Sequence, residues 1–215
     1  MKLLSDISLS WISWVMAALL LLILLANAIR PTMWKAKWRV LLSPMERKYE
    51  DENASAAWNG LSYLFSIGTY ALLLLYLLGT HEAGLSALQP SSFLWIALTI
   101  FGIDLLRQGL MAILQYTFRF HIHLPSVIRH HHDLLLVLAI VYFALLLLVN
   151  HLSYPVLLTL AIVAGIGYIG ISWWKIITTV GLDLHTSCYT LLYYLHIEIV
   201  PIIAMVMISA HIVGA

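Results

Sequence analysis

Six long apolar stretches, separated by shorter polar segments, make up most of the sequence. They cover about residues 8–29, 61–79, 92–118, 134–149, 155–173 and 186–212. Because about 20 apolar residues in a helix span the hydrocarbon core of a bilayer, each stretch predicts a transmembrane helix. We therefore predict an all-α, polytopic transmembrane helix bundle with six spans, which forms a single domain over residues 1–215.

The longest polar segment, from Arg30 to about Asn59, contains an amphipathic stretch at residues 32–44. Tryptophan and basic residues are interleaved there, namely Trp34, Lys35, Lys37, Trp38 and Arg39. A basic helix of this kind lies along the lipid headgroups, with its aromatic rings in the interface. The pattern predicts a short interfacial helix that anchors the protein at the membrane surface.

The composition supports a membrane protein. Hydrophobic residues make up 62% of the chain and charged residues 10%, with a mean hydropathy of +0.95. A soluble domain carries about 25% charged residues, so lipid must cover part of this apolar surface. The net charge of +1 indicates no nucleic-acid partner, and a single cysteine excludes an internal disulfide.

The distribution of lysine and arginine between the spans predicts the orientation. The five loops hold, in order, six basic residues (Arg30, Lys35, Lys37, Arg39, Arg47, Lys48), none, two (Arg119, Arg129), none, and one (Lys175). Cytoplasmic loops are enriched in basic residues, so the first, third and fifth loops are expected in the cytoplasm. Both termini are then periplasmic, and an odd number of spans would break the alternation.

The last apolar stretch carries Glu198 three residues before Pro201. A carboxylate inside a bilayer is expensive, so it normally faces the protein interior and has a partner there. Pro201 lacks an N–H to donate to the carbonyl of Ile197, which predicts a helix kink beside the acid. We expect the polar groups of this stretch to gather around that kink.

Two further charges, Asp104 and Arg107, lie inside the third apolar stretch at about the depth of Glu198. Asp104 and Arg107 can pair within one helix at a spacing of three residues. We hypothesise that Arg107 bridges Asp104 and Glu198 and so joins the third and sixth helices. One interpretation is a static polar clamp. The other is a proton site, because one cation against two carboxylates leaves a proton to be taken up.

Histidines form a second group of candidate residues. His121, His123, His130, His131 and His132 crowd the third loop, whereas His185 and His196 share a helix face in the last stretch. Imidazole is a ligand for zinc, iron and haem, which makes His185, His196, His121 and His123 candidate metal or haem ligands. The spacings match no zinc-helix pattern, and the alternative is that these histidines are structural or interfacial.

No catalytic motif is recognisable. Cys188 lies near a predicted helix start, three residues after His185, but no oxyanion motif or G-x-S-x-G accompanies them. We therefore predict no catalytic residues and interpret Cys188 as a small buried side chain.

The stretch from Tyr189 to Ile203, YTLLYYLHIEIVPII, resembles the closing signature of an uncharacterised Bacteroidota membrane family, the domain of unknown function numbered 4271. Leu192, Tyr193, Glu198, Ile199 and Pro201 fit its form, L-Y-x-C-x-x-E-I-x-P-L, and His196 stands near the position where members often have a cysteine or another small residue. The resemblance implies a multi-pass protein of a bacterial inner membrane. It implies no activity.

These observations lead to three functional expectations. The first is a non-enzymatic accessory or scaffold component of the membrane, because the chain has no catalytic motif and no large loop. The alternatives are a small proton-coupled transporter that uses Glu198, and a haem- or metal-binding membrane protein. The expected partners are the lipid bilayer and, in the accessory role, another membrane protein.

Overall fold

The structure, a computed structural model, describes residues 10–31, 56–82, 89–118, 124–149, 151–180 and 200–214. These residues form six helices and no strand: α1 (Ser10–Ile29), α3 (Ala56–Glu82), α4 (Pro90–Phe118), α5 (Leu124–Leu147), α6 (Tyr154–Val180) and α8 (Val200–Gly214). The predicted all-α class is confirmed. The amphipathic segment at 32–44, with Trp34, Lys35, Lys37, Trp38 and Arg39, lies outside the described residues.

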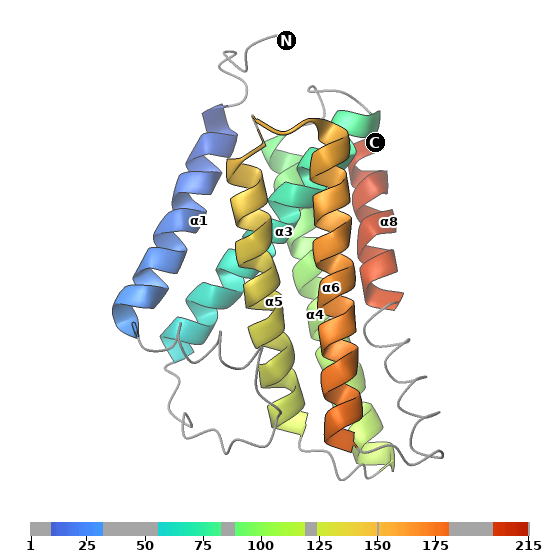
Figure 1. Ribbon diagram of the computed structural model, residues 1–215. Helices are drawn as coiled ribbons and strands as arrows, with labels where there is room; N and C mark the ends of the chain where they lie inside the picture. The colour runs from blue at the N-terminus through green and yellow to red at the C-terminus, as the bar shows by residue number, and fades with distance from the viewer. Residues whose placement is uncertain are drawn as a thin grey trace.

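The helices stand side by side and alternate in direction (Figure 1). α1, α4 and α6 run downward in this view and α3, α5 and α8 run upward, so the start of α1 and the end of α8 lie at the same end of the bundle. Four segments are long and apolar enough to cross a membrane: Trp11–Ile29, Ala56–Gly79, Pro90–Leu110 and Tyr154–Ser172. Two shorter apolar segments lie in α5 and α8. These helices indicate a membrane-embedded protein, and the count of six spans stays a prediction.

Prolines mark where several helices begin. Pro90 is the first residue of α4, and Pro125 and Pro155 are the second residues of α5 and α6. Proline is tolerated in a first turn because its missing N–H would have no partner within the helix there. In α8, Pro201 follows Val200, where the described part of the helix begins. The residues before Val200 lie outside the described part, so the kink expected at Pro201 stays a prediction.

Helix α5 begins well before the predicted span at 134–149, whose bounds stay a prediction. The polar run from His130 to Asp133 was assigned to the third loop, but α5 begins at Leu124, ten residues before the predicted start of that span at 134. The physical reason is that part of this polar run faces the interior of the bundle. Asp133 is buried, with 6% of its surface exposed, and His132 is half-buried. A hydropathy window cannot distinguish such residues from a loop.

α3 lies at the centre of the described bundle and packs against α1, α4, α5 and α8. In the apolar segment of α3, 56% of the residues are buried, compared with 11% in the apolar segment of α1 and 22% in those of α4 and α6. Small residues allow this close packing. Gly68 of α3 faces Leu19 of α1 so closely that an added Cβ would lie 2.5 Å from Leu19 Cδ2.

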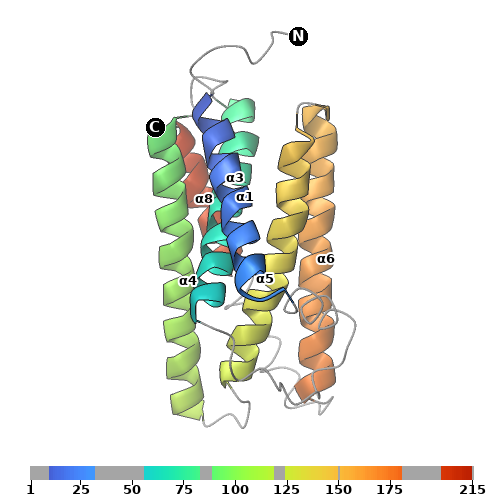
Figure 2. The same ribbon diagram turned by 90° about the vertical axis from the view of Figure 1, so that its left-hand side faces the viewer.

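The core follows from this arrangement. Phe65 of α3 packs edge-on against Phe143 of α5, with ring centroids 5.5 Å apart, and Leu72 is buried in the same cluster. The outward faces carry exposed apolar side chains such as Trp14, Leu98 and Leu106. In a membrane these faces meet lipid. Figure 2 shows α5 and α6 side by side and set apart from α4 and α8.

Candidate functional site

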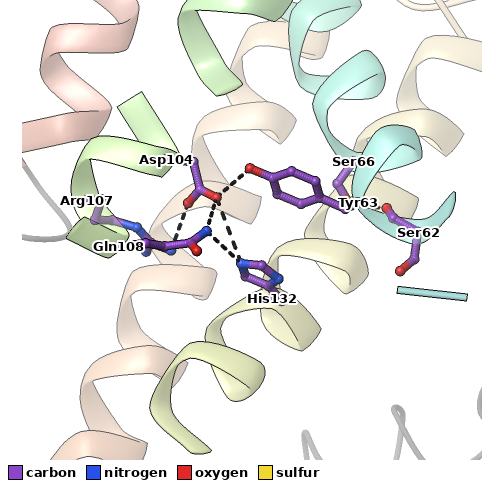
Figure 3. A network of polar contacts seen from close by, with 7 residues as sticks. All are labelled: Ser62, Tyr63, Ser66, Asp104, Arg107, Gln108 and His132. Atoms are coloured by element: carbon purple, nitrogen blue, oxygen red, sulfur yellow. Dashed lines mark hydrogen bonds and ion pairs between the residues drawn. The ribbon is translucent and has the colours of Figure 1, made fainter. Parts of the chain in front are cut away.

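Asp104 is the centre of a polar network inside the bundle (Figure 3). It lies midway along α4, fourteen residues from each end of the helix. Its Oδ1 atom is 2.9 Å from a guanidinium nitrogen of Arg107, and its Oδ2 atom accepts hydrogen bonds from Tyr63 at 2.6 Å and from Gln108 at 2.8 Å. The carboxyl group is therefore held by donors from two different helices.

The Asp104–Arg107 ion pair is formed within α4, at a spacing of three residues. The side chains are almost wholly buried, with 12% of Asp104 and 4% of Arg107 exposed. Burying two charges is tolerated only when they neutralise each other and are hydrogen-bonded. Because both residues belong to one helix, this pair by itself does not join α4 to its neighbours.

The connections from Asp104 to other helices run through uncharged or titratable groups. Tyr63 reaches the carboxylate from α3, and His132 from α5 brings its Nε2 atom to 3.8 Å from Asp104 Oδ2. The Tyr63 and His132 rings are stacked, with centroids 5.2 Å apart and planes 12° from parallel. The stacking holds the imidazole against the tyrosine ring, beside the Asp104 carboxylate.

Gln108 links Asp104 to His132 in a way that depends on the proton of the imidazole. Its Nε2 atom donates to Asp104 and lies 3.3 Å from His132 Nε2. For both contacts to be hydrogen bonds, His132 Nε2 must accept, so the imidazole is neutral with its proton on Nδ1. When Nε2 gains a proton it becomes a donor, and the Gln108 contact turns into a clash of two donors. Protonation of His132 thus forces this corner of the network to rearrange.

A cavity of about 440 Å³ lies beside the network, within the range of small-molecule pockets. Residues of α3, α4, α5, α6 and α8 line it. Its polar end contains Tyr63, Asp104, Arg107, His132 and Asp133. The remainder of the described wall is mainly apolar and extends along α3 as far as Leu77, about 21 Å from Tyr63 at 1.5 Å per residue.

Two tyrosines stiffen the apolar part of the wall. The Tyr70 hydroxyl donates to the carbonyl of Leu135 at 2.7 Å, and the Tyr142 hydroxyl donates to the carbonyl of Ala161 at 3.1 Å. Their rings meet edge to face, with centroids 5.7 Å apart and planes at 85°. Each hydroxyl is satisfied by the backbone of another helix, so the rings present fixed aromatic surfaces to the cavity.

The structure brings together two of the three residues that the sequence predicted as an intramembrane cluster, Asp104 and Arg107. Glu198 lies outside the described residues, so its bridge to Arg107 stays a prediction. The candidate metal or haem ligands, His121, His123, His185 and His196, also lie outside them. Within the described ranges, no group of three His, Cys, Asp or Glu side chains could hold a metal ion.

Sequence reasoning missed three members of the network, namely Tyr63, Gln108 and His132. Gln108 had a usable signal, since it follows Asp104 by four residues and so shares its helix face. Ser62, Ser66 and Thr69 gave α3 a weak polar signal near Tyr63, although the hydroxyls of Ser62 and Ser66 bond to carbonyls of their own helix. His132 was missed because it was assigned to a loop.

The chain gives no match in any of the comparisons with known proteins. No family model matches the sequence, no curated protein is similar to it, and no solved structure resembles the fold. The resemblance to the Bacteroidota family therefore stays a prediction.

Proposed function

We propose that this protein is a small proton-linked transporter of the bacterial inner membrane, with six spans and both termini in the periplasm. The observation that carries the proposal is the position of Asp104 and His132 on the wall of an intramembrane cavity. A carboxylate and an imidazole inside a membrane protein are the groups from which proton relays are built. The resemblance of the last span to the Bacteroidota family supports the choice of membrane.

The charges along the cavity support a proton site. The described wall carries two carboxyl groups (Asp104 and Asp133), one guanidinium (Arg107) and one imidazole (His132). Carboxyl and imidazole groups on the wall of one intramembrane cavity can take up and release protons, so these residues are candidates for a proton site. Glu198, which the sequence places at similar depth, would add a further carboxylate.

The contacts that Asp104 makes with neighbouring helices support a proton site. Arg107 and Asp104 pair within one helix, and the bridge from Arg107 to Glu198 that a static clamp would use lies outside the described residues. The contacts that reach Asp104 from α3 and α5 are a tyrosine hydroxyl and a titratable imidazole. The second of these changes with one proton, so protonation alters the contact between α4 and α5.

The accessory role that the sequence placed first becomes the second candidate, because it needs neither a cavity nor a titratable pair. It predicts a copurifying membrane protein and a network whose charge state is fixed. A role in haem binding would be recognised by a Soret absorption band in the purified protein.

Proton uptake by the purified protein tests the proposal. The wild type in detergent is titrated against a weakly buffered medium and compared with Asp104→Asn, and carboxyl infrared bands identify the group that changes. We expect the wild type to bind about one proton more than the variant as the pH falls through the ordinary histidine range, about 6.5. Thr159→Val is the control, since Thr159 is exposed on α6 and bonds to its own helix. Equal uptake by the wild type and Asp104→Asn would show a static clamp.

A further inference from the structure

The cavity beside Asp104 reaches the surface of the described bundle between α6 and α8. Three of its apolar lining residues are also exposed, namely Ile162 (52%), Ile166 (64%) and Val206 (40%). α6 packs mainly against α5, and α8 packs mainly against α3 and α4. Accordingly, α6 and α8 stand on opposite sides of the bundle in Figure 2. The three exposed residues therefore form the rim of a lateral opening.

The rim is continuous with the surface that meets lipid. Leu160 and Val163 of α6 and Met207 of α8 are exposed apolar neighbours of the rim, and both helices carry apolar membrane segments at this level. Acyl chains cover such faces in a membrane-embedded protein. An occupant can therefore enter the cavity from the hydrocarbon of the bilayer. Entry from lipid selects uncharged molecules, because an ion would lose its water before it reached the opening.

Several hydroxyl groups of the described wall have their hydrogen atoms committed to other groups of the protein. Each donates to a backbone carbonyl or, in one case, to the Asp104 carboxylate, and they belong to Ser62, Tyr63, Ser66, Tyr70 and Tyr142. A hydroxyl that has donated its hydrogen keeps lone pairs that can accept. Ser62 and Ser66 are buried on α3 beside Tyr63 (Figure 3). The described wall therefore offers hydrogen-bond acceptors within an apolar lining.

These acceptors decide which molecules gain by leaving the bilayer for the cavity. A hydrocarbon chain gains little from the transfer, since lipid tails are as apolar as the leucine and isoleucine side chains of the wall. An uncharged O–H or N–H group gains, because it has no acceptor among acyl chains and finds one here. The apolar part of the wall, about 21 Å long from Tyr63 to Leu77, gives room for a long chain beside such a donor.

We propose that the cavity binds an uncharged lipophilic molecule from the bilayer, whose polar group is a hydroxyl or another hydrogen-bond donor. The donor lies at Ser62 and Ser66, and the apolar chain extends along α3 toward Leu77. The molecule enters through the opening between α6 and α8. As the substrate of the proposed transporter, such a molecule rests on that proposal, whereas its binding does not depend on the proton site.

Photolabelling of the full-length protein in phospholipid vesicles tests the proposal. The probe is a long-chain primary alcohol with a diazirine in its chain, and mass spectrometry identifies the labelled residues. We expect label on the apolar wall, at residues such as Leu74 and Met205. Hexadecanol should compete with the probe about tenfold better than its methyl ether, which has the same chain and no donor.

Substitutions on the wall separate recognition of the donor from simple partition into the cavity. Ser62→Ala combined with Ser66→Ala removes two acceptors and keeps good helix formers, so the protein should fold and hexadecanol should compete about tenfold less well. Thr159→Val removes a hydroxyl that is exposed on α6, and it should leave the competition unchanged. Equal competition by the alcohol and its ether in the wild type would overturn the proposal, as would label confined to outward-facing residues.

The time course of labelling after addition of the probe tests the opening. Ile166→Trp narrows the rim and should slow labelling of the cavity several-fold. Val163→Trp is the matched control, because Val163 is 60% exposed on the same helix, away from the described lining. If Ile166→Trp is not monodisperse, Ile162→Trp replaces it, and an unchanged rate would overturn entry between α6 and α8. Proton uptake without ligand is measured separately, so the proton site can stand if the alcohol site fails.

Discussion

The hydroxyl of Tyr63 on α3 donates a 2.6 Å hydrogen bond to Oδ2 of Asp104 on α4. The same tyrosine ring stacks on His132 of α5. One side chain of the central helix thus touches both titratable members of the network. Tyr63 therefore contacts both α4 and α5 from α3.

Tyr63→Phe removes the hydroxyl and keeps the stacked ring. A hydrogen bond to a charged group contributes about 1.5 to 3 kcal/mol, so we expect the free energy of unfolding to fall by about 2 kcal/mol. Unfolding in mixed micelles of SDS measures it. Tyr116→Phe is the matched control, because Tyr116 is 90% exposed on the same helix as Asp104. An equal effect of the two substitutions would contradict a role of the Tyr63 hydroxyl.

Asp104 and Arg107 should behave as a unit. Removing one partner of a buried ion pair leaves the other charge in the protein interior, which typically costs about 3 to 5 kcal/mol. Asp104→Asn and Arg107→Met should therefore each destabilise the protein strongly, and the double variant should lose less than the sum of the two. A double-mutant cycle on the unfolding free energy measures this coupling. Additive losses would mean that the pair contributes through separate neighbours.

The close contact between Gly68 and Leu19 decides whether a third substitution, Gly68→Ala, stabilises or destabilises the protein. Alanine normally stabilises a helix relative to glycine by up to about 1 kcal/mol. At Gly68 its Cβ would lie 2.5 Å from Leu19 Cδ2, so we expect Gly68→Ala to destabilise the protein. In a Leu19→Ala background the same change should be neutral or stabilising. Gly102→Ala, where nothing lies within 4 Å of the added Cβ, serves as the control in thermal unfolding.

The predicted orientation can be tested by single-cysteine labelling after Cys188→Ser removes the native thiol. The start of α1 at Ser10, the connection between α5 and α6 with His151, and the end of α8 at Gly214 belong to one end of the bundle, and the start of α3 at Ala56 belongs to the other (Figure 1). Cysteines at the first three positions should react with a membrane-impermeant reagent from the periplasm, and a cysteine at Ala56 should not. Labelling of Ser10 and Gly214 from opposite sides would refute an even number of spans.

Much of the architecture was predictable from the sequence, because a helix that crosses lipid must consist of a long run of mainly apolar residues. The spans of α1, α3, α4 and α6 follow from the length of apolar runs, and the Asp104–Arg107 contact follows from helix geometry alone. The start of α5 was not predictable by hydropathy, since His132 and Asp133 are polar and face the bundle interior. Tyr63 was not predictable either. Its pairing with Asp104 joins residues 41 positions apart, and only the packing of α3 against α4 brings them together.

The spacing of Asp104 and Arg107 on one helix bears on how the chain enters its membrane. Each residue alone at the centre of a span opposes insertion by about 2.5 to 3.5 kcal/mol. Their contact needs no other helix, so it can form as soon as α4 coils, before the ribosome has completed α5. The translocon then meets a segment whose charges already neutralise each other. If Arg107 were moved to a different face of α4, the two charges would not neutralise each other within the helix. We then expect the span to leave the translocation channel for lipid more slowly during synthesis.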